Sequence, residues 1–253
     1  LITNYKLQIT NYELRMRLIG RLYSLNKEAF FEGFTDYHSH ILPGVDDGVQ
    51  TLEQSLEILD CYEQLGIRIV WLTPHIMEDI PNTTTHLQEC FACLQSAYRG
   101  KITLHLAAEY MLDNLFQERF KRHDLLPLGE RGNRLLVETS YLYPAMKFYD
   151  TLRRIKEKGY YPVLAHPERY NYMGERGYKT LKEMGVKFQL NLLSLDGMYG
   201  KTVRNKARWL LDNGMYDLIG TDVHTWEACK QVKELSLSSR TLKKLSVFKT
   251  NGQ

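Results

Sequence analysis

The chain has 253 residues with 43% hydrophobic and 25% charged residues, a composition typical of a folded globular protein and a length sufficient for one large domain. Its 33 basic and 30 acidic residues leave a net charge of only +3, which gives no electrostatic reason to expect a nucleic-acid partner. No apolar run reaches the length of a membrane span, and the N-terminus lacks the apolar core of a secretion signal. We therefore expect a cytoplasmic protein that is not embedded in a membrane.

The first thirty residues stand apart from the rest of the chain. They contain a near-repeat with a period of seven, residues 2–7 and 9–14, and no clear alternation of strand and helix patterns. We expect residues 1–30 to be a peripheral N-terminal extension and residues 31–253 to form the folded domain.

From residue 34 onward, short apolar runs alternate with segments of helical periodicity. The runs that we expect to form strands are residues 34–38, 67–73, 102–108, 135–139, 162–165, 188–192 and 218–221. The expected helices are residues 51–65, 83–98, 148–158 and 201–212 and the stretch after Trp226, with a capping box at Thr51 and Gln54 and with C-terminal caps at Gly66, Gly159, Gly185 and Gly214. Seven strands alternating with helices predict a parallel sheet with right-handed crossovers, either open and doubly wound or closed into a barrel.

The end of the first expected strand carries the most informative motif, His38-Ser39-His40 followed by Asp46-Asp47-Gly48. Alternate residues of a strand point to the same face, so the two imidazoles can bind one metal ion. Asp47, in the loop just after, can add a hard oxygen ligand. Imidazole and carboxylate together favour zinc, iron or manganese over calcium.

Ionisable side chains also follow four other expected strands at the same topological place. They are His75 after the second strand, Glu109 after the third, His166 after the fifth, and Asp222 and His224 after the seventh. Ligands spread over five strand ends favour a barrel, whose catalytic face gathers the carboxyl ends of its strands, over an open sheet with a single switch point.

The number of candidate ligands exceeds what one ion can use, since catalytic zinc takes three protein ligands and keeps an open position. The set His38, His40, Asp47, His75, Glu109, His166, Asp222 and His224 suits two or three ions, which can clamp a phosphoryl group and activate water. Arg169 follows His166 by three residues, and its planar guanidinium matches phosphate geometry. Metals together with this arginine indicate a phosphoester substrate.

These residues resemble the polymerase and histidinol phosphatase (PHP) superfamily over about residues 34–245. The resemblance rests on the run from Asp36 to Gly48, on Thr73-Pro74-His75 and Glu109, on His166-Pro167-Glu168-Arg169-Tyr170, and on Asp222-Val223-His224. Within the superfamily, the chain is most similar to the bacterial manganese-dependent tyrosine-protein phosphatases of capsule and exopolysaccharide clusters.

The resemblance implies an α/β fold, a distorted seven-stranded (βα) TIM-like barrel of the PHP type, with two or three divalent ions, manganese being favoured over iron or zinc. It implies hydrolysis of phosphotyrosine in the tail of a bacterial tyrosine kinase that acts as a polysaccharide co-polymerase. A metal-bridging hydroxide would attack, without a phosphoenzyme.

The resemblance also implies roles for individual residues. A first ion would take His38, His40, Glu109 and Asp222, with Glu109 bridging to a second ion that His166 also binds; Asp47, His75 and His224 would serve a third region. The residues expected to take part in catalysis are Arg169, which would bind the phosphate, Asp47 and His224.

One departure from the family pattern concerns the segment after the last motif. Family members often carry an arginine a few residues after the final Asp-x-His, whereas here Lys230 is the nearest cation. Lysine could replace the arginine only as a point charge. Upstream, Tyr141-Leu142-Tyr143 could shape a phosphotyrosine pocket or could simply pack.

Two alternative functions stay open at this point. One is a small-molecule phosphatase of the histidinol-phosphatase type, because the metal ligands alone do not fix the substrate. The other is a non-catalytic metal-binding partner of a polysaccharide assembly complex, which the complete ligand set disfavours. An amide hydrolase would commonly use a bridging lysine at a strand end, and the chain offers none.

The four cysteines, Cys61, Cys90, Cys93 and Cys229, show no paired framework, and we expect free thiols in a reducing compartment. Cys93 and Arg99 match the C-x5-R spacing of thiol-dependent tyrosine phosphatases. That chemistry needs a phosphate-wrapping loop at a helix N-terminus, whereas this segment has the pattern of a helix interior. We therefore interpret the match as chance.

Overall fold

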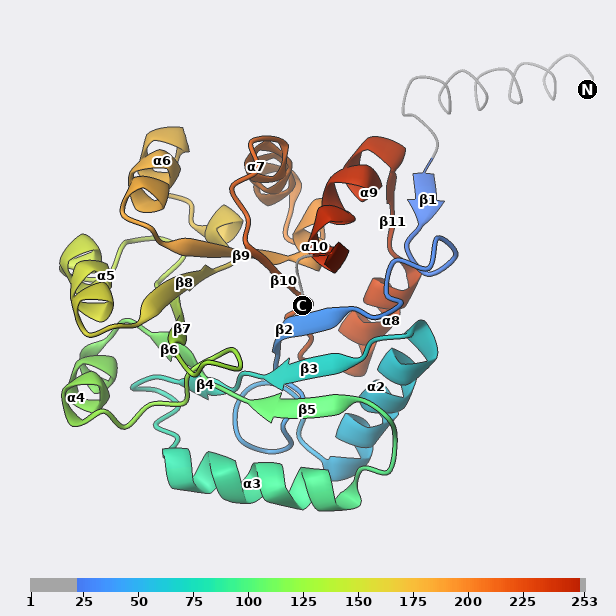
Figure 1. Cartoon of the computed structure of the whole chain (residues 1–253), viewed down its shortest axis with the longest axis horizontal. Coiled ribbons are helices and arrows are strands. Elements are labelled where there is room, and N and C mark those ends of the chain that lie inside the picture. The colour runs from blue at the N-terminus through green and yellow to red at the C-terminus, as the bar shows by residue number, and fades with distance from the viewer. Residues whose placement is uncertain (1–21, 251–253) are drawn as a thin grey trace, which may run out of the picture.

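The computed structural model describes residues 22–250, which form a mixed α/β fold (Figure 1). Two sheets of parallel strands form its centre: three strands in the order β2-β3-β5 and six in the order β10-β9-β8-β7-β6-β4. The strands are β2 (Thr35–Ser39), β3 (Ile69–Leu72), β4 (His75–Ile76), β5 (Thr103–Leu106), β6 (Glu109–Met111), β7 (Arg134–Glu138), β8 (Tyr161–Ala165), β9 (Lys187–Asn191) and β10 (Leu218–Gly220).

Two of the expected strands are each followed by a second short strand that was not expected. Residues 67–73 contain β3, and β4 begins after them at His75, with Pro74 between the two strands. Proline has no N–H to donate to a sheet ladder, so the ladder is interrupted there. The third expected strand, residues 102–108, contains β5, and β6 begins directly after it at Glu109.

The two sheets meet at both of their sides. On one side the chain itself passes from β3 to β4 and from β5 to β6, with the amide of Ala107 donating to Leu72 at 2.9 Å and that of Glu109 to Pro74 at 3.1 Å. On the other side, the amide of His40 donates to Val223 at 2.9 Å and the amide of Asp222 donates to His38 at 2.8 Å. The end of β2 therefore lies beside the residues that follow β10.

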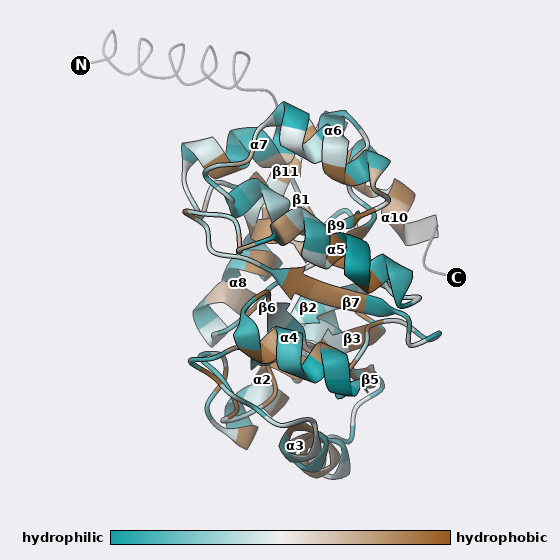
Figure 2. Cartoon of the chain, turned by 90° about the vertical axis from the view of Figure 1, so that its left-hand side faces the viewer, coloured by the Kyte–Doolittle hydropathy of each residue, from teal (hydrophilic) through white to brown (hydrophobic). Residues whose placement is uncertain are grey.

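The helices lie around the outside of the strands (Figure 1). They are α2 (Leu52–Leu65), α3 (Thr84–Ala97), α4 (Asn114–Arg122), α5 (Phe148–Glu157), α6 (Glu175–Glu183), α7 (Lys201–Asp212), α8 (Trp226–Glu234), α9 (Ser239–Leu245) and α10 (Val247–Thr250), with short 3-10 turns at Pro167–Arg169 and Leu192–Leu195. In Figure 2 the hydrophobic strand β7 is seen between α4 and α5, whose outer surfaces are hydrophilic. Among residues 22–250, no helix is both long and apolar enough to cross a membrane.

The ends of the helices largely follow the sequence pattern. The Thr51 hydroxyl accepts from the amide of Gln54 at 3.3 Å, as expected for an N-cap, although the Gln54 side chain accepts from Gln50 and not from Thr51. Gly66 caps the C-terminus of α2 at a φ of 94°, a left-handed conformation that glycine adopts without a Cβ clash.

Two hydrophobic clusters lie on opposite faces of the strands. On β7, Leu135 and Val137 belong to a large cluster that includes helix residues, whereas Leu136 belongs to a small one with Val163 and Trp71. Because side chains alternate along a strand, Arg134 and Glu138 share the face of Leu136. On this face of β7, the cation Arg134 comes first, the apolar Leu136 is in the middle, and the carboxylate of Glu138 is at the end.

The segment before β2 is attached to the fold within its described part. The strand β1 (Leu22–Ser24) pairs antiparallel with β11 (Ser236–Ser238). Leu25 is fully buried and Phe30 is 4% exposed, both in the large cluster. Residues 1–21, which contain the near-repeat, lie outside the described residues.

Candidate metal centre

Six parallel strands carry ionisable side chains at or just after their ends, and these side chains lie at one end of the fold. His38 lies on β2, His75 begins β4 and Glu109 begins β6, while His166 and Asp222 follow β8 and β10. All five are at most 9% exposed. The last residue of β7, Glu138, also belongs to this group and is 3% exposed.

The closest approach of donor atoms involves His38, His40, Glu109 and Asp222. The Nε2 atoms of His38 and His40 are only 3.0 Å apart. An oxygen of Glu109 lies 3.1 Å from the first and 3.3 Å from the second. The Oδ1 atom of Asp222 lies 3.4 and 3.5 Å from the same two nitrogens. Four donor atoms thus converge on one point.

Glu109 connects this point to a second one. Its other carboxylate oxygen is 3.1 Å from Nε2 of His166. The Nδ1 atom of His75 lies 3.3 Å from Glu109 and 3.2 Å from Glu138, so Glu138 provides a further carboxylate beside the shared one. A carboxylate with imidazoles on both oxygens would be able to bridge two divalent ions.

A third group of donors lies toward the solvent. Asp47 has a side chain that is 65% exposed, and its Oδ1 atom is 3.6 Å from Nε2 of His75 and 3.6 Å from Nε2 of His224. The ring of His224 stacks on that of His40, with centroids 4.0 Å apart. This edge of the centre is the part that a substrate can reach.

The donor atoms fit divalent metal ions. The residues form four groups, each with its ligand atoms within 4.8 Å of one another: His40, Asp47, His75 and His224; His38, Glu109 and His166; His38, His40 and Asp222; and His75, Glu109 and Glu138. Nδ1 of His75 and Nδ1 of His166 are buried without a hydrogen-bond partner. Buried polar atoms are rarely left unpaired, and His75 Nδ1 faces two carboxylates, as expected of a metal ligand.

Hydrogen bonds around the centre fix which nitrogen of His38 and of His40 faces it. Nδ1 of His38 lies 2.8 Å from the Gln189 side-chain oxygen, and Nδ1 of His40 lies 2.8 Å from Asp46. Because these oxygens only accept, both Nδ1 atoms carry a proton, so Nε2 is the atom that each ring can offer to an ion once its own proton is lost. Such outer contacts orient metal ligands and raise their basicity.

The ionisable side chains of the centre shift one another's pKa values. Burial alone would lower the pKa of His38, but attraction to Glu109 and Asp222 raises it to about 9. Burial would raise the pKa of Glu109, but attraction to His38 and hydrogen bonds from histidines lower it well below its usual range. Burial and repulsion from His40 lower the pKa of His224 to about 4. Without an ion, the inner histidines therefore hold protons that metal binding has to displace.

The backbone is strained at two of the ligands. His166 has a φ of 33° and Asp222 a φ of 54°, values that residues other than glycine rarely adopt. Each residue directly follows the expected fifth or seventh strand. Strain of this kind persists where surrounding contacts enforce it, and it is concentrated at functional sites.

Arg169 lies beside the centre and is held on three sides. Its Nη1 atom donates to Asp222 at 2.9 Å. Its guanidinium carbon lies 4.4 Å from the ring centroids of both Tyr141 and Tyr199. The cation is thus sandwiched between two aromatic faces, an arrangement that restricts its orientation.

The match to a family model identifies the chain. Residues 34–245 match the model described as capsular polysaccharide synthesis, CpsB/CapC. The chain belongs to the CpsB/CapC family. The family named by the sequence motifs is thereby confirmed.

Curated relatives and a solved structure agree with this assignment. Tyrosine-protein phosphatase YwqE of Bacillus subtilis is 28% identical over 75% of this chain and 76% of its own length. Tyrosine-protein phosphatase CpsB of Streptococcus agalactiae is 27% identical over 75% of this chain and 82% of its own length. A structure from work on YwqE and Streptococcus pneumoniae CpsB, described as unique metal-dependent tyrosine phosphatases, matches with a TM-score of 0.76 at 23% identity and covers 86% of this chain and 92% of that one. At that identity, the match shows the fold alone.

The structure brings all eight candidate ligands from the sequence into these groups and adds residues that the sequence reasoning missed. Glu138 was placed in an expected strand but not as a ligand, although it ends β7 beside Glu109. Asp46 and Gln189 were not assigned to the site. Asp46 could have been found from its place between His40 and Asp47, whereas Gln189 lies in a strand and carries no motif.

Two further expectations concern residues outside the centre. Cys93 lies within α3, and all four cysteines are free thiols, as expected. The ammonium of Lys230 lies 5.4 Å from the ring centroid of Trp226 on α8, and among the described residues it makes no ion pair with the metal centre.

Proposed function

We propose that the chain is a metal-dependent phosphatase that removes phosphate from tyrosine side chains. The observation that carries the proposal is the convergence of imidazole and carboxylate donors around Glu109 in a chain that belongs to the CpsB/CapC family. The names of its relatives support tyrosine as the phosphorylated residue. Neither the small-molecule phosphatase nor the non-catalytic alternative gains support from these matches.

We propose that two or three divalent ions, with manganese first among the candidates, occupy this centre. His38, His40, Glu109 and Asp222 would hold one ion, and Glu109 with His166 and Glu138 would hold a second. His75, Asp47 and His224 would serve the outer region. When bound, the ions would neutralise charge on the phosphoryl oxygens and generate the attacking hydroxide from water.

The chain's own residues would orient the phosphate. Arg169 is 19% exposed at its side chain, and its ion pair with Asp222 uses one guanidinium nitrogen. The remaining N–H groups are available for the phosphate oxygens, which guanidinium binds in a forked geometry. Asp47 and His224 lie on the exposed side, where we propose that they act in catalysis.

An apolar surface beside Arg169 supports a peptide substrate. Tyr141, Leu142, Tyr143 and Met146 are 37, 60, 72 and 87% exposed, and the ring centroid of Tyr141 is 5.8 Å from that of His166. Exposed apolar residues grouped next to a site often bind a partner. We propose the phosphotyrosine tail of a bacterial tyrosine kinase that controls polysaccharide synthesis as this partner.

We also propose that the strands together form the distorted seven-stranded barrel of the PHP type. If β3 with β4 and β5 with β6 each count as one interrupted strand, the two sheets contain seven strands. The bonds that join β2 to the segment after β10 support closure on the remaining side. A closed barrel would gather all six ligand-bearing strand ends around one axis.

The proposed function is tested by comparing substrates on the manganese-loaded protein. Phosphotyrosine peptide, phosphoserine peptide and histidinol phosphate are assayed at equal concentrations. We expect kcat/KM for the phosphotyrosine peptide to exceed the other two by about a hundredfold or more, a difference of about 2.7 kcal/mol in transition-state binding. A preference for histidinol phosphate would contradict the proposal.

A further inference from the structure

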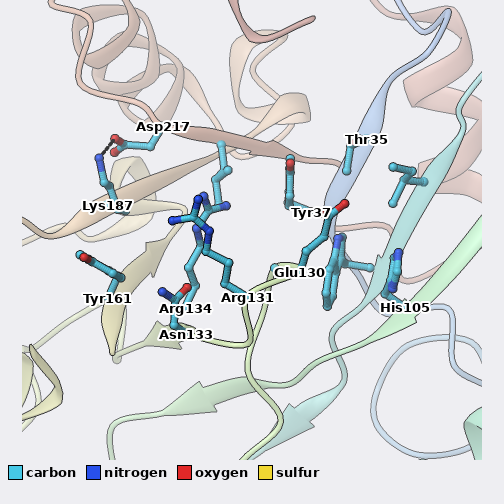
Figure 3. A pocket seen from close by; sticks show the side chains of 14 residues that line it. Thr35, Tyr37, His105, Glu130, Arg131, Asn133, Arg134, Tyr161, Lys187 and Asp217 are labelled. Atoms are coloured by element: carbon cyan, nitrogen blue, oxygen red, sulfur yellow. Dashed lines mark hydrogen bonds and ion pairs between the residues drawn. The ribbon is translucent and has the colours of Figure 1, made fainter. Parts of the chain in front are cut away.

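A second pocket lies at the end of the strands opposite to the metal centre. Its volume is about 540 Å³, and it is lined by the first residues of six strands together with the turn that precedes β7 (Figure 3). The small hydrophobic cluster of Leu136, Val163 and Trp71 lies between the amino ends and the carboxyl ends of these strands. The pocket is therefore separate from the metal centre and needs its own explanation.

Two arginines enter this pocket. Arg134 begins β7 and is half-buried, and Arg131 comes from the preceding turn; in Figure 3 both side chains lie in the middle of the pocket. Within residues 22–250, neither guanidinium forms an ion pair with a carboxylate. A half-buried cation without a partner is costly, so an anion from outside the chain would be stabilised here.

The carboxylates of the pocket do not neutralise the arginines. Asp217 is already held by Lys182 and Lys187 and by the amide of Phe188. Glu130 also lines the pocket and is one carboxylate for two arginines. With Lys187 paired to Asp217, the two arginines and Glu130 leave one net positive charge at the cavity.

The turn that carries the arginines is well anchored. The backbone of Leu128 exchanges two hydrogen bonds with Arg134, of 2.7 and 3.2 Å, and the amide of Gly132 donates to Gly129 at 2.8 Å. The Arg134 side chain lies against Gly129, which has a φ of 86°. The backbone of the turn is therefore fixed with both arginines at the pocket, which lowers the entropy cost of binding an anion there.

Aromatic rings line the rest of the pocket. His105 stacks on Trp71 with ring centroids 4.5 Å apart, and Tyr37 and Tyr161 add two further rings. Figure 3 shows Tyr161 on one side of the arginines and Tyr37 and His105 on the other. The volume lies within the range of pockets that bind small organic molecules and exceeds what a simple inorganic anion needs.

We propose that this pocket binds a small phosphate ester that carries a planar ring, of the nucleoside monophosphate class. Arg131 and Arg134 hold the phosphate through charge-assisted hydrogen bonds, and the rings of Tyr37 and His105, which lie together on one side of the arginines, pack against the base. The proposal does not depend on the activity of the metal centre, because the two sites share no lining residue.

The test is isothermal titration of the full-length protein with AMP, adenosine and inorganic phosphate. A chelator is present, so that metal-dependent hydrolysis does not consume AMP. The variants are Arg134→Gln and Arg131→Gln; the second removes an exposed turn side chain and therefore answers the question even if the first misfolds. Arg208→Gln, on the exposed face of α7, controls for net charge, and Arg169→Gln controls for binding at the metal centre.

We expect AMP to bind at least about tenfold more tightly than adenosine or phosphate. Each pocket variant should lower the affinity for AMP at least about tenfold, whereas Arg208→Gln and Arg169→Gln should leave this affinity unchanged. If inorganic phosphate bound as tightly as AMP, the proposed packing of the rings against the base would be contradicted. Loss of binding in Arg169→Gln alone, or no binding of AMP at all, would overturn the proposal.

Discussion

Glu138 shows how a side chain outside every motif can belong to the candidate metal centre. It is the last residue of β7, and its oxygens lie 3.2 Å from His75 and 3.8 Å from His166. The sequence shows it only as a polar residue at the end of an apolar run. Glu109 also stands at the end of an apolar run, but it was found because its place in the order of motifs singled it out. The strand-end position, and not the residue type, was the usable signal.

The first prediction concerns this carboxylate. Glu138→Gln keeps the shape of the side chain but removes the charge next to His75 and His166. We expect kcat on a phosphotyrosine peptide to fall about a hundredfold, and manganese affinity to fall about tenfold or more, with little change in thermal stability. Glu157→Gln, at an exposed position on α5, is the control. Full activity of Glu138→Gln at low manganese would exclude Glu138 as a ligand.

Asp46 acts on the centre through His40 and is a positioning residue. Its Oδ2 atom accepts from Nδ1 of His40 and from the amide of His75, and Oδ1 accepts from the amide of Gly48. Burial would raise its pKa, but attraction to His40 and these bonds lower it to about 2. It thus stays ionised at neutral pH and fixes the tautomer of His40.

The second prediction follows from this role. Asp46→Asn leaves an amide that can present either oxygen or nitrogen to His40, so the imidazole loses a charged partner. Manganese affinity should fall about 10- to 100-fold, and activity should return at high manganese. A drop in kcat that saturating metal does not restore would show that Asp46 does more than position His40.

At the level of elements, Asp36 joins β2 to the end of β10. Its carboxylate accepts from the amide of Thr221 at 2.8 Å and from the Thr221 hydroxyl at 2.6 Å, and Tyr62 of α2 bonds to the same hydroxyl. Asp36 is fully buried, and burial raises its pKa to about 6 despite these bonds. This contact helps to hold the ligands that follow both strands.

The third prediction is a pH dependence of stability. A carboxyl with a raised pKa in the folded protein contributes stability that is complete below its ordinary pKa of 3.8 and is lost as the pH rises through about 6. The loss amounts to about 3 kcal/mol. Chemical unfolding in chelator should show Asp36→Asn gaining that much relative to the wild type between pH 4 and pH 8. A constant difference between the two proteins across this range would contradict the assignment.

The sequence predicted strands and helices unevenly, for reasons found in particular elements. Strand ends were located well because buried runs pass directly into polar residues, as at Leu72 and Ala165. The short strand β4 was missed because it has only two residues, His75 and Ile76, which follow Pro74 and were read as part of a motif. The helix α4 was not predicted, although Asp113 caps its N-terminus by accepting from the amide of Phe116.

At the scale of the whole molecule, the strands separate two ends with different chemistry. The carboxyl ends carry imidazoles and carboxylates, and the amino ends carry the arginines and rings of the second pocket. The first end was predictable because its ligands recur at equivalent positions. The second was not, because Arg131 and Arg134 come together only through the turn at Gly129 and Gly132.

The fourth prediction concerns protons in the metal centre as a whole. Burial lowers but nearby carboxylates raise the pKa of His38, to about 9, and Asp46 and Glu109 raise that of His40 despite its burial. The proposed manganese ions would have to displace these protons, so manganese affinity should increase as the pH rises from 6 toward 9. Calorimetry in buffers of different ionisation enthalpy should detect about one to two protons released at pH 7. Binding without proton release would contradict the ligand assignment.

The most direct test of the central claim is the hydrolysis of a phosphotyrosine peptide by the purified protein in chelator, with added Mn²⁺, and with Mn²⁺ after thiol alkylation. The account predicts no activity in chelator, activity with Mn²⁺, and the same activity after Cys90 and Cys93 have been alkylated. Activity that persists in chelator but is lost on alkylation would contradict it, since the reaction would then depend on a cysteine and not on the histidine and carboxylate centre.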